Sequence, residues 1–214
     1  MALSKQAKEI VANFDETTKL GDIKKLGKEI RQDHDLALEL WSQGSHSSRL
    51  LSTLLFDKKL LTEPDLDALA ADLFKIEREQ RNQLGDWLLA NQLSKDRNLV
   101  SLMESWQVHT SPIMRRWYWY YQARLRWTGR TPPEGSSAAL LDAIEPSIAT
   151  EDPDVQWVMN FCVGWIGIFE PELRSRCIAL GKEHELYKND PVAKNCTPSY
   201  LPEFIRIEVE KRES

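Results

Sequence analysis

Apolar residues recur every three or four positions along most of the chain, which is the spacing of one face of an α-helix. In residues 20–31 this stripe is formed by Ile23, Leu26 and Ile30, with lysines on the opposite side. Similar stripes follow over residues 33–41, 45–56, 63–76 and 82–93. Because the alternating runs typical of β-strands are scarce, the pattern predicts an all-α protein.

Two segments show where helices end and begin. Residues 128–137 (TGRTPPEGSS) are polar and rich in Pro and Gly, which predicts a loop. Pro202 and Glu203 begin a last predicted helix, and basic residues close it at Lys211 and Arg212. Charges placed in this way complement the helix dipole.

A weak internal repeat organises the predicted helices. Ser111 and Asp152, 41 residues apart, each precede a proline and have a long polar residue four places later, Arg115 or Gln156. Residues 45–49 have the same spacing without the proline. A period near 40 with two helices per unit is typical of HEAT-like repeats, which stack into a curved α-solenoid with a concave surface. The alternative is a plain helical bundle in which capping residues recur by chance.

The composition is that of an ordinary globular protein. The chain has 214 residues, 42% of them hydrophobic, and its formal net charge is −5. This length predicts a single domain over residues 1–214. The longest uncharged stretch of the apolar C-terminal region, residues 155–169, is too short to span a bilayer, so no membrane association is expected.

Several kinds of chemistry have no support in the sequence. The three cysteines are widely spaced and form no C-x-x-C pair, so neither a disulfide framework nor a zinc site is expected, and a cytoplasmic location follows. The chain has no glycine-rich phosphate loop, no H-x-x-x-H pair and no G-x-S-x-G motif. We therefore expect neither a metal nor an organic cofactor.

One segment is strongly basic and aromatic. Residues 105–133 contain five arginines and no acidic residue, with seven Trp or Tyr residues among them. If one helix continues far enough, it places three arginines within roughly 60° of one another around its axis: Arg115, Arg126 and Arg130. Such a row could bind successive phosphates. The aromatic rings could stack on bases. The alternative is that Trp117 and its neighbours are core, and that the arginines pair with acids of other helices.

Three stretches and the C-terminal end resemble a known family. They are residues 24–51, 105–127 (SWQVHTSPIMRRWYWYYQARLRW), 152–169 (DPDVQWVMNFCVGWIGIF) and 194–212. Together they resemble the HEAT-repeat DNA alkylation repair family, the AlkD-like alkylpurine DNA glycosylases. The resemblance implies HEAT-like helical repeats stacked into a curved α-solenoid, with a concave basic face that holds DNA. It also implies hydrolysis of the N-glycosidic bond of cationic alkylated purines.

The resemblance assigns roles to individual residues. Trp165 matches the active-site tryptophan of the family, and Arg116 matches its phosphate-binding arginine. The family's catalytic aspartate follows a tryptophan by four residues, and Asp86 is the best match when a gap is allowed. Asn82 stands where that tryptophan would be, although Trp87 lies next to Asp86.

The expected site therefore has two sets of residues. Asp86 and Trp165 are the candidate catalytic residues. The candidate DNA-binding residues are Arg115, Arg116, Arg126, Arg130, Trp87 and His109. The alternatives are that Asp86 is an acid opening a helix, that Trp165 is a core residue between Gly164 and Gly167, and that His109 is an ordinary loop residue.

The function expected from these observations is that of a monomeric DNA-binding alkylation repair protein and candidate glycosylase. A carboxylate that stabilises a sugar cation and orients water would suffice for that reaction. Two alternatives stay open. One is a non-catalytic binder of DNA structures on the same fold, favoured by the missing motif tryptophan, and the other is a helical-repeat scaffold that binds protein.

Overall fold

The computed structural model describes residues 3–15 and 17–213. This part of the chain forms twelve α-helices and two short 3-10 helices and contains no β-strand, which confirms the all-α prediction. The chain divides into two compact units, one ending at Trp117 and the other beginning at Tyr118, so the long helix α8 (Pro112–Trp127) contributes to both. A single domain over residues 1–214 stays a prediction.

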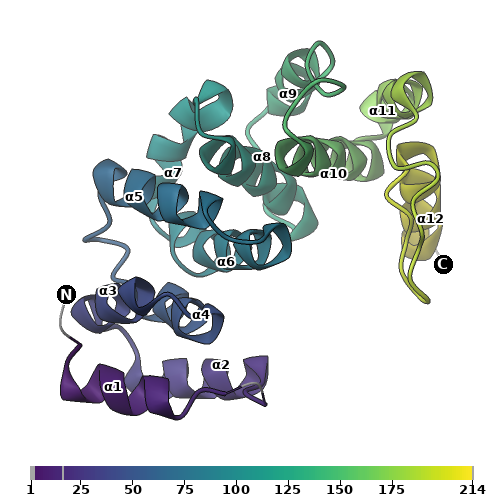
Figure 1. Cartoon of the computed structure of the whole chain (residues 1–214). Helices are drawn as coiled ribbons and strands as arrows, with labels where there is room; N and C mark the ends of the chain where they lie inside the picture. Colours follow the sequence, from purple (N-terminus) through teal and green to yellow (C-terminus); the bar gives the residue numbers. More distant parts are fainter. Residues whose placement is uncertain (1–2, 16, 214) are drawn as a thin grey trace. The chain divides into compact units, whose positions relative to one another are not determined.

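Unit 1 is built from pairs of helices. Figure 1 shows α1 with α2, α3 with α4 and α5 with α6 as successive layers of this unit. Their bounds are Lys5–Ala12 (α1), Leu20–Ile30 (α2), His34–Gln43 (α3), His46–Leu55 (α4), Glu63–Phe74 (α5), Arg78–Asn91 (α6) and Arg97–Met103 (α7). The 3-10 helices are Leu93–Lys95 and Glu104–Val108.

The predicted helix starts in this unit depend on side-chain caps. Asp33 accepts a hydrogen bond from the backbone N–H of Leu36 and begins α3, and Ser45 accepts one from Ser48 and begins α4. These caps satisfy backbone donors that the first helical turn leaves unpaired. Leu40 and Leu51 are fully buried where α3 packs on α4.

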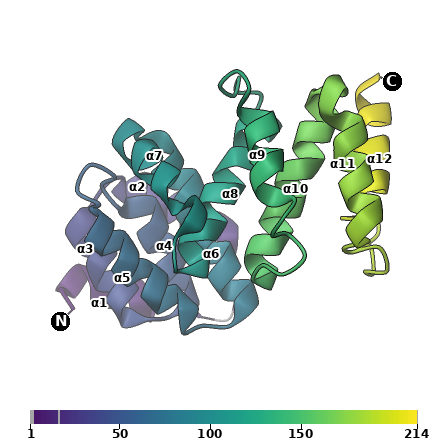
Figure 2. The same cartoon turned by 90° about the horizontal axis from the view of Figure 1, so that it is seen from above.

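Unit 2 contains the end of α8 and the last four helices, α9 (Ser136–Ile144), α10 (Pro153–Phe169), α11 (Pro171–His184) and α12 (Leu201–Glu213). Figures 1 and 2 show these four helices side by side in chain order. Helix α10 packs on both α11 and α12. Gly181 permits the close approach of α11 and α12, because a Cβ atom there would lie 2.6 Å from Cβ of Leu201. In the described part of the chain, no helix is both long enough and apolar enough to cross a membrane.

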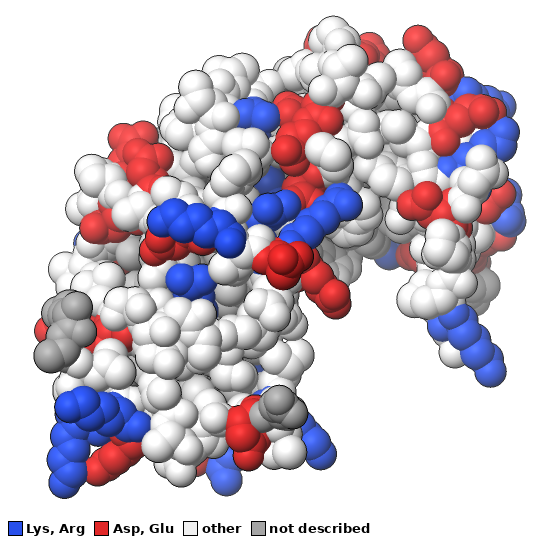
Figure 3. Space-filling model, viewed as in Figure 1, with Lys and Arg blue, Asp and Glu red and all other residues white. Residues whose placement is uncertain are grey.

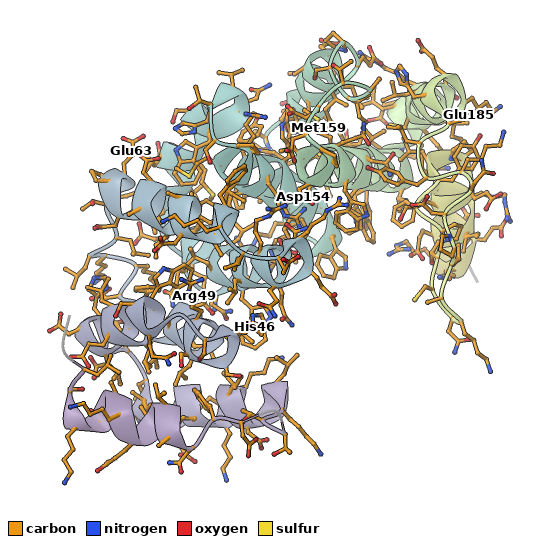
Figure 4. All side chains as sticks on the ribbon, in the orientation of Figure 1. His46, Arg49, Glu63, Asp154, Met159 and Glu185 are labelled. Carbon is orange, nitrogen blue, oxygen red and sulfur yellow. The ribbon has the colours of Figure 1, made fainter. Side chains whose placement is uncertain are left out.

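The internal repeat has a structural role. The polar residue four places after each cap donates a hydrogen bond to a backbone carbonyl of the segment before its own helix. The bonds run from Arg49 to Trp41 O (3.3 Å), from Arg115 to His109 O (2.6 Å) and from Gln156 to Ile148 O (2.7 Å). Arg49 is labelled on α4 in Figure 4. Each bond ties the start of a helix to the chain that leads into it, so the repeated spacing reflects repeated local geometry.

Three boundaries differ from the sequence prediction. Helix α6 begins at Arg78 instead of Asn82, because its first turn (REQR) is polar and carries no apolar signal. Helix α9 begins at Ser136, so the loop is shorter than predicted. Helix α8 ends at Trp127, and Gly129 follows with a φ of 71°. Arg130 therefore lies beyond the helix, and the predicted row of Arg115, Arg126 and Arg130 along one helix is wrong.

Candidate nucleic-acid interface

The candidate catalytic residue Asp86 is paired with Arg116 in unit 1. The Nη2 atom of Arg116 lies 2.9 Å from Oδ1 and 3.1 Å from Oδ2 of Asp86. The Arg116 side chain is 5% exposed, whereas that of Asp86 is 27% exposed. The carboxylate is thus held from the protein side by a buried guanidinium and still reaches solvent.

The packing of α8 on α6 brings the two residues together. The indole of Trp117 is fully buried and its Nε1–H donates to the backbone carbonyl of Gly85, at 3.1 Å. A Cβ atom on residue 85 would lie only 3.1 Å from that same Nε1 atom, so glycine allows the helices to approach this closely. The neighbours of this bond, Asp86 and Arg116, are set facing each other as a result.

Asp86 lies in the third turn of α6, because the helix begins at Arg78. The interpretation of Asp86 as a helix-opening acid is therefore wrong. Asn82 lies one turn before it on the same helix, in the place where the family motif has a tryptophan. The carboxylate can accept hydrogen bonds or stabilise a nearby cation, although the guanidinium beside it offsets part of its negative charge.

Unit 1 also has a groove with basic and aromatic walls, and one residue of its lining, Trp87, is the sequence neighbour of Asp86. Its volume is about 460 Å³, and its walls come from α2, α4 and α6. Two lysines from α2, Lys24 and Lys28, line it together with Trp87 and Asn91 from α6 and Leu54 from α4. The Nζ atom of Lys24 lies 5.2 Å from the centroid of the Trp87 ring, a cation–π distance. We call this feature the α2–α6 groove.

The α2–α6 groove carries positive charge alone. Among the described residues that line it, the lysines are the only charged ones. Figure 3 shows basic and acidic residues intermixed over the face it presents, so charge of a single sign is confined to small areas there. In the sequence these lysines lie opposite the apolar stripe of residues 20–31, and no motif marks them as a site.

His109 and Arg115 are held in the turn that leads into α8. Nδ1 of His109 accepts a hydrogen bond from the backbone N–H of Ser111, at 3.0 Å, and its Nε2 atom lies 3.9 Å from Asp67. Arg115 donates to the carbonyls of His109 and Thr110. Both side chains therefore hold this turn in place.

Arg126 belongs to a buried polar network in unit 2. Its side chain is 1% exposed and its guanidinium donates to Ser137, to Glu170 and to the carbonyl of Gln122. Ser137 also donates to Glu170. The positive charge is thus compensated inside the protein, as in the sequence alternative in which arginines pair with acids of other helices. Burial close to this network raises the pKa of the Cys162 thiol to about 12.

Arg130 and Trp127 lie at the surface of the same unit. Arg130 is exposed, and Trp127 is 46% exposed at the end of α8. The guanidinium of Arg124 lies 5.7 Å from the Trp127 ring. Of the arginines predicted to bind DNA, Arg130 is the one whose residue is exposed in the structure.

Trp165 lies in an aromatic cluster of unit 2 and is 5% exposed. Its ring stacks on Trp127 and Phe169 and meets Phe161 and Phe204 edge-on, with centroid distances of 5.7–6.3 Å. The guanidinium of Arg212, from α12, lies 5.1 Å from the Trp165 ring. The surroundings are those of a core tryptophan, which was the alternative interpretation.

The structure therefore brings Asp86 and Arg116 together, with Trp87 in the groove beside them. Trp165, Arg126 and Arg130 belong to the other unit. No group of His, Cys, Asp and Glu residues suited to hold a metal ion occurs among the residues described.

Helix pairs linked by repeated capping geometry define a helical-repeat protein. No protein-family model matches the chain, and no curated protein does so either. A solved structure described as "a new family of proteins related to the HEAT-like repeat DNA glycosylases with affinity for branched DNA structures" is similar at a TM-score of 0.69 and 17% sequence identity. The similarity covers 98% of this chain and 88% of that one, and it confirms the HEAT-like repeat fold that the sequence resemblance implied.

Proposed function

We propose that this protein binds DNA and that the α2–α6 groove of unit 1 holds part of the DNA backbone. The observation that carries the proposal is the pairing of two exposed lysines with an aromatic wall in that groove. Lys24 and Lys28 are four residues apart on one helix, so their side chains project from the same face. They can neutralise neighbouring phosphates while the Trp87 ring contacts a sugar or base.

The net charge of −5 is compatible with this proposal. Binding depends on the potential at the contact surface, and a local basic site attracts a polyanion even on an acidic protein. Arg116 would contribute as a positioning residue, because its guanidinium holds the carboxylate of Asp86, the sequence neighbour of Trp87.

The structural relative suggests which DNA structure this chain prefers. That protein is described as having affinity for branched DNA structures, and the two folds are alike. We propose that this chain likewise prefers a branched junction to a linear duplex of the same length.

The test is fluorescence anisotropy of the full chain with a three-way junction and a matched duplex, over a series of salt concentrations. Binding through lysines predicts a linear fall of log affinity with log salt concentration. The double variant Lys24→Glu, Lys28→Glu removes two phosphate contacts and should reduce that slope by about 1.8. The matched control is Lys25→Glu, which changes an exposed lysine of the same helix outside the groove.

Two results would reject the proposal. An equal loss of affinity in the control and in the double variant would show a general charge effect instead of a site. Absence of salt-dependent DNA binding would favour the helical-repeat scaffold that binds protein.

A second candidate is a glycosylase activity on cationic alkylated purines within the same DNA complex. The observation that favours it is the solvent-reaching carboxylate of Asp86, which is the sequence neighbour of the groove residue Trp87. A methylated purine carries a positive charge and is already a good leaving group. The carboxylate would need only to stabilise the sugar cation and orient a water molecule.

The assay is the release of free methylated base from methylated duplex DNA. Asp86→Asn keeps an acceptor for Arg116 and removes the negative charge, so it should abolish release and spare DNA binding. Glu79→Gln, at an exposed position of the same helix, is the control and should keep full activity. Release by the Asp86→Asn protein at the wild-type rate would reject the carboxylate role.

A further inference from the structure

A small pocket with aromatic walls lies in unit 2, between α10, α12 and the chain that leads into α12. Its volume is about 130 Å³. A cavity of roughly 150 Å³ can hold one benzene molecule, so this pocket is close to the size of one six-membered ring. We call it the Asn160 pocket. It is lined by Trp157, Asn160, Phe161, Thr197, Ser199 and Phe204.

The aromatic walls belong to a row of rings on α10. Trp157, Phe161, Trp165 and Phe169 are spaced every fourth residue, which places them along one face of the helix. Trp157 and Phe161 stack with their ring centroids 5.3 Å apart and their planes 16° apart. Both side chains are half-buried, so they border the pocket and also reach the surface.

Asn160 gives the pocket a specific polar group. Only 4% of this residue is exposed, and its Nδ2 atom donates to the carbonyl of Ser199 at 2.8 Å. Its Oδ1 atom is buried and has no hydrogen-bond partner among the described residues. A buried acceptor in this condition is unfavourable, and a donor that entered the pocket would remove the penalty.

We propose that the Asn160 pocket receives one unpaired nucleobase of bound DNA. The inference rests on the DNA-binding function proposed above and adds a second contact, in the other unit. The six-membered ring of the base lies against Trp157 and Phe161, and its exocyclic amino group donates to Oδ1 of Asn160. None of the lining residues is charged, so the pocket offers no cation to a phosphate group. Aromatic stacking and one acceptor match the face and the edge of a base.

The edge chemistry predicts a preference among bases. Adenine and cytosine present an amino donor, whereas thymine presents the O4 acceptor and a methyl group at the corresponding position. Adenine and cytosine are therefore preferred to thymine. A junction or bulge supplies such unpaired bases without the cost of opening a base pair, in agreement with the preference for branched DNA that we propose.

The test compares duplexes that carry one bulged nucleotide: adenine, thymine or an abasic analogue. The full chain is titrated with each by fluorescence anisotropy, beside a fully paired duplex. Since stacking on an aromatic side chain contributes on the order of tenfold in affinity or more, the adenine bulge should bind at least about tenfold tighter than the abasic one. Thymine should fall between them.

Two variants and one control test whether the preference for the adenine bulge arises in the Asn160 pocket. Trp157→Ala and Asn160→Leu should each bring the ratio of adenine to abasic affinity close to one. Asn160→Leu also removes the bond to Ser199, so Trp157→Ala at a half-buried position is the variant that preserves the fold. Phe169→Ala removes a ring of the same row that lies outside the pocket and should leave the ratio unchanged.

The outcomes separate this inference from the proposed function. Equal affinity for adenine and abasic bulges, with normal binding of the paired duplex, would overturn the pocket and leave DNA binding intact. An equal effect of Phe169→Ala and Trp157→Ala would also overturn it. If no DNA binds at all, the proposed function fails, and titration with 2-aminopurine riboside then decides on the pocket. Saturable quenching of 2-aminopurine fluorescence that Trp157→Ala abolishes would assign the pocket to free nucleosides. Absence of quenching would overturn the pocket.

Discussion

Removing Asp86 alone should destabilise unit 1 at least as much as removing both members of the Asp86–Arg116 pair. In Asp86→Ala, the guanidinium of Arg116 stays in place with 5% of its side chain exposed and loses its bonds to the carboxylate. Breaking a fully buried pair in this way costs about 3–5 kcal/mol. Because 27% of the Asp86 side chain is exposed, the pair is partly solvated. We therefore expect a loss of about 3 kcal/mol in the free energy of unfolding.

The reverse variant should cost less. Arg116→Met removes the guanidinium from the carboxylate of Asp86, but this carboxylate already reaches water, so we expect a loss of about 1–2 kcal/mol in the free energy of unfolding. In the double variant neither charge remains. The double variant should therefore lose about 2 kcal/mol less free energy of unfolding than the sum of the two single losses.

Urea unfolding followed by tryptophan fluorescence measures the free energy of unfolding of the wild type, the two single variants and the double variant. The buried rings of Trp106 and Trp117 report on unit 1. The Asp86→Ala protein should melt about 6–12 °C lower than the wild type in a parallel thermal experiment. Glu79→Ala, on the exposed side of α6, should change the free energy of unfolding by less than about 0.5 kcal/mol. A double variant whose loss equals the sum of the single losses would refute the reasoning.

Three further predictions concern unit 2. Gly181→Ala should cost about 1–3 kcal/mol in thermal unfolding, because the new methyl group would lie 2.6 Å from Cβ of Leu201. Burial acts to raise the pKa of Glu208, but hydrogen bonds from Lys211, Arg212 and Thr197 outweigh it and hold the pKa at about 2. This contribution to stability is present above pH 4.5 and is lost as the pH falls toward 2, so Glu208→Gln should flatten the acid side of the stability profile. Cys196 should be the one thiol that a disulfide reagent titrates in the native protein.

Each of these has a control. Gly21→Ala, at a position with no heavy atom within 4 Å of the added Cβ, should not destabilise the protein, and a loss equal to that of Gly181→Ala would contradict the steric argument. Glu210→Gln, on the same helix as Glu208, should keep the acid limb of the wild type. Cys162 and Cys177 are buried and burial raises the pKa of each to about 12, so two more thiols should react only after denaturation. Rapid reaction of all three in the native state would contradict this burial.

The fold was largely predictable because its determinants are local. Apolar stripes mark the helices, and a cap such as Asp33 or Asp152 marks a start within a few residues of sequence. The repeat of caps 41 residues apart also gave the correct class of fold. The start of α6 was missed because a polar first turn is compatible with both helix and loop, and tertiary packing decides between them.

The candidate site was less predictable because it depends on contacts between distant segments. Asp86 and Arg116 were both singled out, but their pairing requires the bond from Trp117 to Gly85, which no local pattern reveals. Their charge suggested that Arg126 and Arg115 bind phosphate. In the structure both donate hydrogen bonds to groups of the protein itself. The lysines of the α2–α6 groove were visible on the polar face of their helix, yet nothing in the sequence indicated which helix lies opposite.

The row of rings on α10 has a consequence for synthesis of the chain. Phe204 and Arg212, both on α12, pack against Trp165, but they follow it in the sequence and emerge from the ribosome later. At about 5–20 residues per second, α10 waits on the order of seconds before α12 can cover it. During that interval the part of this aromatic face that α12 later covers is open to chaperones and to other nascent chains. The yield of this protein in cells is therefore expected to depend on translation speed between α10 and α12.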